Sequence, residues 1–103
     1  MSPIDFNELD TTVHGPVRLG ILTALRMDGP HDFTTLKKRL KASDGALGMH
    51  LQILEGQGYI ASRKAFVGRR PKTTYRLMPH GRRALARYLD ALRRLLDAIE
   101  QRS

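Results

Sequence analysis

The sequence predicts a mainly α-helical fold with a small β-hairpin and a long C-terminal helix. Three observations carry this prediction. Apolar residues recur at helical spacing in the first half of the chain. From Tyr59 the pattern changes to two extended runs around a Gly-Arg-Arg-Pro tetrad. From about Pro79 a helical apolar pattern continues unbroken to Ile99. We therefore expect one domain over residues 1–103, in which 78–103 form the long helix.

Two helices are expected before residue 30. Ser2 followed by Pro3 is typical of a helix start, and the short helix would carry Ile4, Phe6 and Leu9. A second helix opens after His14-Gly15-Pro16 and closes at Asp28-Gly29-Pro30. Its buried side would hold the apolar residues spaced at helical intervals, which are Val17, Ile21, Leu22 and Leu25.

The next two helices are joined by a short turn. Thr34 is a candidate N-cap for a helix that buries Leu36 and Leu40 and exposes a basic side. Ser43 is the candidate N-cap of the 44–57 helix, where Leu47, Leu51 and Leu54 fall at i, i+4 and i+7. Two helices connected this tightly predict a helix-turn-helix.

The hairpin and the last helix complete the predicted order. Residues 59–67 and 72–77 are the expected strands, with Gly68-Arg69-Arg70-Pro71 as their charged tip. The last helix carries two adjoining apolar stripes, one of Leu85, Leu89, Leu92, Leu96 and Ile99 and one of Ala84, Tyr88, Ala91, Leu95 and Ala98.

The charge of the chain indicates a polyanionic partner. The formal net charge is +8, and residues 37–83 hold 12 of the 18 Lys and Arg against two acids, Asp44 and Glu55. With no cysteine, the chain offers neither a disulfide nor a thiolate metal site. With no signal peptide and no apolar run of about 20 residues, a cytoplasmic location and no membrane partner are expected.

Several short motifs resemble the winged helix-turn-helix transcriptional regulators related to the MarR and ArsR groups. They are Val13-His14-Gly15-Pro16, Asp44-Gly45-Ala46-Leu47, the Leu54-Glu55 to Gly58-Tyr59-Ile60 junction, Gly68-Arg69-Arg70-Pro71-Lys72-Thr73 and Leu77-Met78-Pro79-His80-Gly81. The resemblance runs from about Leu9 to the C-terminus. It implies a DNA-binding dimer with the 44–57 helix in the major groove and the hairpin beside it.

Three groups of residues are predicted to meet double-stranded DNA. Phosphates would be held by Lys37, Lys38, Lys41 and Ser43. The hairpin tip would enter the minor groove with Arg69 and Arg70, and the charge would be extended down both strands by Lys64, Lys72 and Arg76. On the 44–57 helix, Gln52 could read a base edge, whereas Ala46 and Met49 could touch only thymine methyls.

The nearly apolar outer face of that helix leaves a second interpretation open. A winged helix could instead be a protein interaction module that uses Met49 and Ile53, and a DNA contact, unlike an apolar one, must weaken steeply with salt. The leading hypothesis is a sequence-dependent transcriptional regulator, expected to act as a repressor.

The double stripe on the last helix predicts a two-fold homodimer, since one core contact needs only one stripe. The expected interface residues are Ile4, Phe6, Leu9, Tyr88, Leu92, Leu95, Leu96 and Ile99. The alternative is one wide core face within a monomer.

Catalytic chemistry is not expected. The four histidines are scattered without metal-ligand spacing, and the serines have no triad motif around them. We therefore predict no enzyme activity, no metal, no cofactor and no evident small-molecule ligand.

Overall fold

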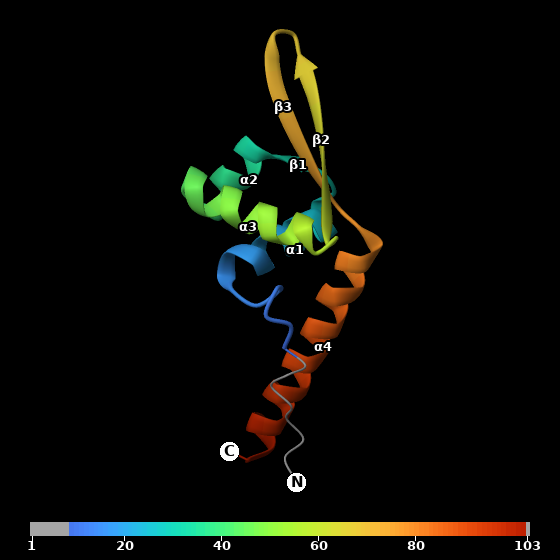
Figure 1. Ribbon diagram of the computed structural model, residues 1–103. Helices are drawn as coiled ribbons and strands as arrows, with labels where there is room; N and C mark the ends of the chain where they lie inside the picture. The colour runs from blue at the N-terminus through green and yellow to red at the C-terminus, as the bar shows by residue number, and fades with distance from the viewer. Residues whose placement is uncertain (1–8, 103) are drawn as a thin grey trace.

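The computed structural model describes residues 9–102, and its order of elements confirms the predicted fold class (Figure 1). The elements are α1 (Pro16–Asp28), β1 (His31–Asp32), α2 (Phe33–Leu40), α3 (Asp44–Gly56), β2 (Ile60–Val67), β3 (Arg70–Leu77) and α4 (Pro79–Arg102). The N-terminal helix expected to carry Ile4 and Phe6 lies outside the described residues. Leu9 is half-buried and packs against the core.

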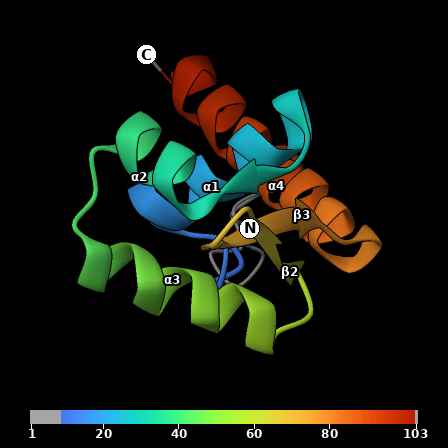
Figure 2. The same ribbon diagram turned by 90° about the horizontal axis from the view of Figure 1, so that it is seen from above.

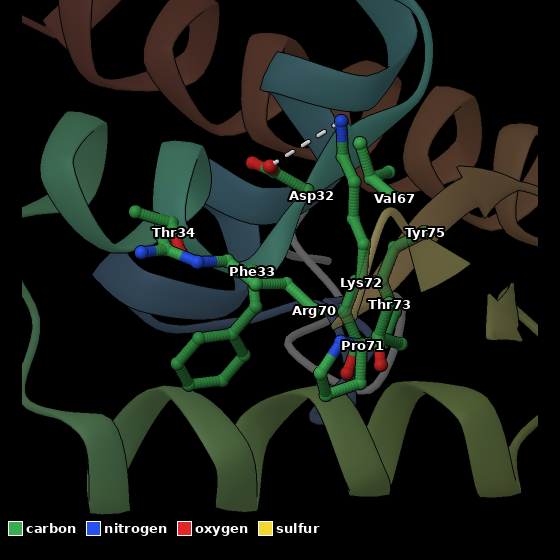
Figure 3. Close-up of a pocket in the computed structure, with 9 residues that line it drawn as sticks. All are labelled: Asp32, Phe33, Thr34, Val67, Arg70, Pro71, Lys72, Thr73 and Tyr75. Carbon is green, nitrogen blue, oxygen red and sulfur yellow. Dashed lines mark ion pairs between the residues drawn. The ribbon is translucent and has the colours of Figure 1, made fainter. Parts of the chain in front are cut away.

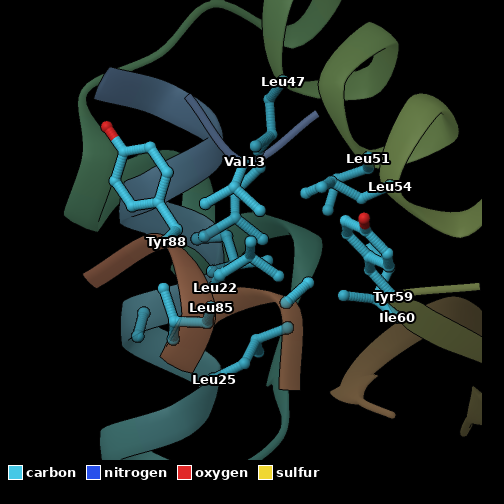
Figure 4. Packing of buried hydrophobic residues seen from close by; sticks show 14 residues of the cluster. Val13, Leu22, Leu25, Leu47, Leu51, Leu54, Tyr59, Ile60, Leu85 and Tyr88 are labelled. Carbon is cyan, nitrogen blue, oxygen red and sulfur yellow. The ribbon is translucent and has the colours of Figure 1, made fainter. Parts of the chain in front are cut away.

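The core lies between α1 and the helices that surround it, because α1 contacts α2, α3 and α4. Ile21 and Leu22 of α1 are fully buried. The predicted leucine stripe of α3 faces them: Leu47, Leu51 and Leu54 are at most 2% exposed (Figure 4). Fully burying a leucine or isoleucine contributes about 1.5–3 kcal/mol, so these side chains fix the position of α3.

Side-chain caps set the boundaries of α2 and α3. Ser43 accepts a hydrogen bond from Ala46 N–H at 3.2 Å, which confirms it as the N-cap of α3. The prediction of Thr34 as the N-cap of α2 is wrong, because Asp32 takes that role and accepts from Thr35 N–H at 2.8 Å. Asp32 Oδ1 lies in place for this bond because β1 holds the residue in an extended conformation immediately before the helix.

The C-terminus of α3 is closed by a Schellman motif. Tyr59 N–H donates to the Leu54 carbonyl and Gly58 N–H donates to the Glu55 carbonyl, both at 3.0 Å. Gly58 has φ +75°, a left-handed conformation that suits glycine. The chain therefore leaves α3 at a defined angle and enters β2.

The sheet has three antiparallel strands in the order β1-β3-β2. The two-residue β1, which was not predicted, pairs His31 with Tyr75 and Asp32 with Thr74. The hairpin turn is tighter than expected: β3 begins at Arg70 rather than Lys72, because Gly68 at φ +66° lets Gly68 and Arg69 alone make the turn.

The first half of α4 packs against the core, and the second half extends beyond the other helices (Figure 1). Ala84, Leu85, Tyr88 and Ala91 are buried, whereas Leu89, Leu96 and Ile99 are 47%, 50% and 56% exposed. Tyr88 was expected to contact a second copy. It lies instead in the core of its own chain, since it is 3% exposed and its hydroxyl lies 2.8 Å from His14 Nδ1. No helix within residues 9–102 has the length and apolar character needed to cross a bilayer.

Candidate nucleic-acid interface

The β2–β3 hairpin projects from the helical body on the side away from the C-terminal end of α4 (Figure 1). Residues 63–72 are all exposed, and β1 pairs only with Thr74 and Tyr75 near the hairpin's base. Strand residues rise about 3.3 Å each, so the free part of the hairpin reaches roughly 15 Å beyond the three-stranded region. It has the shape of a wing that can enter a groove.

The strand register divides the wing's cations between its two faces. Paired residues share a face, and successive residues alternate. Lys64 lies on the face toward α3, which also carries Ser62, whose hydroxyl donates to Glu55 of α3 at 2.7 Å. The opposite face carries four cations, Arg63, Arg70, Lys72 and Arg76. Lys64 and Lys72, predicted together, therefore point to opposite sides of the wing.

Two ionisable groups near the base of the wing have shifted pKa values, mainly through hydrogen bonding and burial. Hydrogen bonds from Thr35 lower the pKa of Asp32, and Lys72, with Nζ 3.8 Å from Asp32 Oδ2, lowers it further. Burial raises the pKa of Tyr75, and the nearby Glu55 carboxylate adds to that effect. The ion pair between Lys72 and Asp32 therefore ties the base of the wing to the start of α2.

The start of α2 and strand β3 share one concave surface (Figure 3). An open cavity of about 440 Å³ lies between them. Phe33 and Thr34 line it from α2, and Arg70 and Lys72 line it from β3. The predicted wing residues and the helix that carries the predicted phosphate-binding lysines are therefore neighbours.

The helix that borders this surface, α2, also carries basic residues. Lys37 Nζ lies 2.9 Å from Asp44 Oδ1, so Lys37 forms an ion pair with the first turn of α3. Lys38 and Lys41 are exposed and make no ion pair within residues 9–102. Lys41 has φ +51°, a left-handed conformation at the C-cap of α2 that favours glycine. Lys41 is therefore an exposed cation at the α2–α3 turn.

The outer face of α3 is smooth and largely apolar, as the sequence predicted. Met49 is 51% exposed, Gln52 is exposed and Ala46 is half-buried. Gly45 and Gly48 lie beside them with no atom within 4 Å of where a Cβ would stand. Ser43 is occupied as the cap of this helix. Gln52 is therefore the polar side chain on this face with paired hydrogen-bonding groups.

The histidines within residues 9–102 have structural partners. Arg18 Nε donates to His50 Nδ1 at 3.0 Å, which ties α1 to α3. His31 is 8% exposed and lies between the Gly29 carbonyl at 2.7 Å and Arg39 Nη1 at 2.8 Å. In the part of the chain that the structure describes, no cluster of three His, Asp or Glu side chains could hold a metal ion.

Sequence reasoning missed three exposed wing residues. Arg63 joins Arg70, Lys72 and Arg76 on one face, and the alternation of a hairpin could have found it once the register was known. Phe66 and Val67 are 76% and 63% exposed, although their residue types predict burial.

Comparison with known proteins agrees with this geometry. Residues 17–96 match the family model described as a winged helix DNA-binding domain. An uncharacterized protein of Methanocaldococcus jannaschii is 33% identical over 84 residues, covering 82% of this chain and 91% of that protein.

Two solved structures share the fold over most of both chains. A transcriptional regulator homologue from Pyrococcus horikoshii has a TM-score of 0.82 and 26% identity, covering 90% of this chain and 93% of its own. A putative transcriptional regulator from Salmonella typhimurium has a TM-score of 0.71 and 28% identity, with coverages of 93% and 88%.

The chain belongs to the winged helix DNA-binding domain family, and its partner is DNA. The DNA-binding family model and the two regulator structures agree with the prediction of no enzyme activity. Its place in the MarR group in particular stays a prediction.

Proposed function

We propose that this protein is a homodimeric transcriptional repressor that occupies a duplex with its wing and its α2–α3 surface. The observation that carries the proposal is the exposed wing, which bears Arg69, Arg70 and Lys72, with Arg70 and Lys72 beside the start of α2. Matching charge to phosphate gives affinity without requiring base contacts, and this suits an α3 face that offers little beyond Gln52.

A salt series on DNA binding tests the wing assignment. Fluorescence anisotropy with a duplex of about two helical turns gives the slope of log K against log salt. The double variant Arg69→Ala, Arg70→Ala removes two proposed phosphate contacts, so the slope should become shallower by about 1.8. An unchanged slope would contradict the wing's role in the complex.

The control removes the same charge elsewhere. Arg26 at the end of α1 and Arg83 on α4 are exposed, so the double variant Arg26→Ala, Arg83→Ala matches the net charge of the wing variant. Its slope should stay close to that of the unchanged chain. If both variants lose the same slope, binding depends on net charge rather than on the wing.

The exposed leucines of α4, Leu89 and Leu96, support the proposed dimer. Leu89, Leu96 and Ile99 are each about half exposed, and Leu92 and Leu95 lie half-buried between them. Leu89, Leu92, Leu96 and Ile99 follow the alternating three- and four-residue steps of a helix–helix seam. A second copy of α4 would cover this stripe and place two wings on one duplex.

Light scattering tests the dimer. We expect Leu96→Asp to halve the mass of the particle, because burying an unpaired carboxylate in an apolar seam is strongly unfavourable. Gln101→Asp adds the same charge on the opposite, exposed side of α4 and should leave the mass unchanged. A Leu96→Asp protein of unchanged mass would contradict the α4 seam.

The repressor assignment rests on occupancy and needs its own test. A site selected from random duplexes is placed over a promoter, and transcription is measured in vitro with increasing protein. Falling transcript supports repression, and rising transcript contradicts it. The rival interaction module, using Met49 and Ile53, predicts a partner affinity that barely responds to salt and no slope on DNA.

A further inference from the structure

The end of the wing carries an apolar pair that the phosphate contacts do not explain. Phe66 and Val67 are 76% and 63% exposed, immediately before the Gly68-Arg69 turn. Single exposed apolar residues are common on protein surfaces. Two of them in succession at the most protruding point of the chain indicate a surface that becomes covered when the wing meets its partner.

The register gives this apolar tip a defined shape. Phe66 pairs with Pro71 on the face toward α3, and Val67 pairs with Arg70 on the other face. In a two-residue hairpin the Val67–Arg70 pair is the hydrogen-bonded one, so the nitrogen of Pro71 points outward, where no donor is needed. The ladder is therefore complete up to the turn, and Phe66 is presented by ordered strands rather than by a loose loop.

Cations accompany each apolar side chain. Arg69 occupies the turn, Arg70 shares a face with Val67, and Lys64 lies two residues from Phe66 on the same face. Among residues 9–102, none of these three cations makes an ion pair. An apolar tip surrounded by unpaired cations is complementary to a duplex, where stacked bases lie between two rows of phosphates.

We propose that Phe66 and Val67 form a wedge that enters the minor groove, partly unstacks one base step and bends the duplex. The cations beside them hold the flanking phosphates while the wedge is inserted. Pyrimidine–purine steps such as TA unstack at the least cost, so the wedge makes the protein prefer deformable sites without reading a base edge. This inference rests on the proposed DNA-binding function and adds a determinant of specificity to it.

The test separates bending from binding. Duplexes of about two helical turns carry either repeated TA steps or a stiff A-tract, with 2-aminopurine at a central step and a donor and acceptor dye at the ends. The unchanged protein should raise 2-aminopurine fluorescence and energy transfer on the TA duplex, and should prefer it over the A-tract roughly tenfold.

The variant Phe66→Thr, Val67→Thr keeps strand-forming residues and all wing cations. We expect it to bind both duplexes about equally, with an unchanged salt slope and neither optical signal. Met27→Thr removes an equally exposed apolar side chain, at 74%, from the end of α1 and should behave like the unchanged protein.

Two results would overturn the inference in distinguishable ways. If the threonine variant bends and unstacks the TA duplex as the unchanged protein does, the wedge is absent while DNA binding stands. If anisotropy detects no salt-dependent binding by the unchanged protein, the proposed function and the wedge fail together. Loss of binding to anionic vesicles in the threonine variant, with DNA bending unaltered, would assign the tip to a membrane surface instead.

Discussion

The replacement Gly81→Ala tests how closely α4 is pressed against the junction of α3 and β2. A Cβ at residue 81 would stand 2.1 Å from the Tyr59 carbonyl oxygen and 2.8 Å from the Tyr59 carbonyl carbon. Real Cβ atoms essentially never approach another heavy atom closer than 3.0 Å, and backbone cannot swing aside as a side-chain end can. The alanine variant must therefore move the start of α4 by roughly 1 Å.

Gly81→Ala changes the free energy of unfolding through two unfavourable contributions and one favourable one. Overpacking of this kind costs about 1–3 kcal/mol. The same carbonyl accepts a hydrogen bond from Met78 N–H at 3.0 Å, and disturbing it costs about 1 kcal/mol more. Alanine's better helix propensity returns about 0.5–1 kcal/mol. We expect a net loss of about 2–3 kcal/mol in the free energy of unfolding.

Urea unfolding followed by circular dichroism, at one fixed protein concentration, measures this loss as a lower midpoint with an unchanged m-value. Gly48→Ala is the matched control, because no atom lies within 4 Å of its Cβ position, and it should gain about 0.5–1 kcal/mol. A Gly81→Ala protein as stable as the unchanged chain would refute the close packing of α4 on Tyr59.

Three further predictions concern the caps and the buried hydroxyl. Lys41→Gly should raise the free energy of unfolding by about 0.5–1 kcal/mol, since φ +51° favours glycine. The same variant should make the DNA salt slope shallower by about 1, and an unchanged slope would exclude Lys41 from the phosphate contacts. Asp32→Ala should lower the free energy of unfolding by about 1 kcal/mol at neutral pH, because the N-cap hydrogen bond from Thr35 is lost. Since the pKa of Asp32 is lowered in the folded state, the stability difference between the variant and the unchanged chain should shrink below about pH 4. A stability difference in thermal melts that does not depend on pH would contradict this. Burial, together with the hydrogen bond to Asp10, raises the pKa of Tyr59 to about 12. The contribution of its hydroxyl to the free energy of unfolding is therefore complete below about pH 10 and is lost as pH rises through 12. In thermal melts at alkaline pH, Tyr59→Phe should show less of this loss of stability than the unchanged chain.

The elements that could be predicted from the sequence are those whose periodicity extends over several turns. Leu47, Leu51 and Leu54 define α3 because a stripe of three leucines suits only a helix buried on one side. Ser43 could be predicted as a cap because it directly precedes that stripe. In each case local chemistry and tertiary packing require the same structure, so the sequence pattern is sufficient.

The elements that could not be predicted depend on pairing between distant segments. Strand β1 has two residues, too few for any period, and exists because His31 and Asp32 meet β3. The same pairing places Asp32, rather than Thr34, at the N-cap of α2. Tyr88 was assigned to a dimer because its stripe is amphipathic, but periodicity alone does not show which of two stripes faces the core.

The division of the wing's cations is a register effect of the same kind. The sequence places Lys64 and Lys72 on two strands, but only the pairing of Lys64 with Thr73 and of Ala65 with Lys72 puts them on opposite faces. Shifting the register by one residue would reverse every assignment. The basic composition of the hairpin was therefore predictable, whereas the orientation of its charges was not.

Helix α3 and the wing, the two elements proposed to meet DNA, differ in what they can contribute to recognition. Gly45 and Gly48 give up about 1 kcal/mol each of helix propensity on an open face, leaving α3 smooth enough to lie close to a groove floor but with little besides Gln52 to distinguish bases. The wing has an apolar tip and arginines, which in the minor groove distinguish mainly A·T from G·C pairs and respond to groove width. If both the DNA-binding proposal and the wedge proposal hold, changing base pairs under α3 should alter affinity less than replacing one flexible base step under the wing by a stiff one. Measuring the affinity for every single base-pair substitution in a selected site gives that ranking directly.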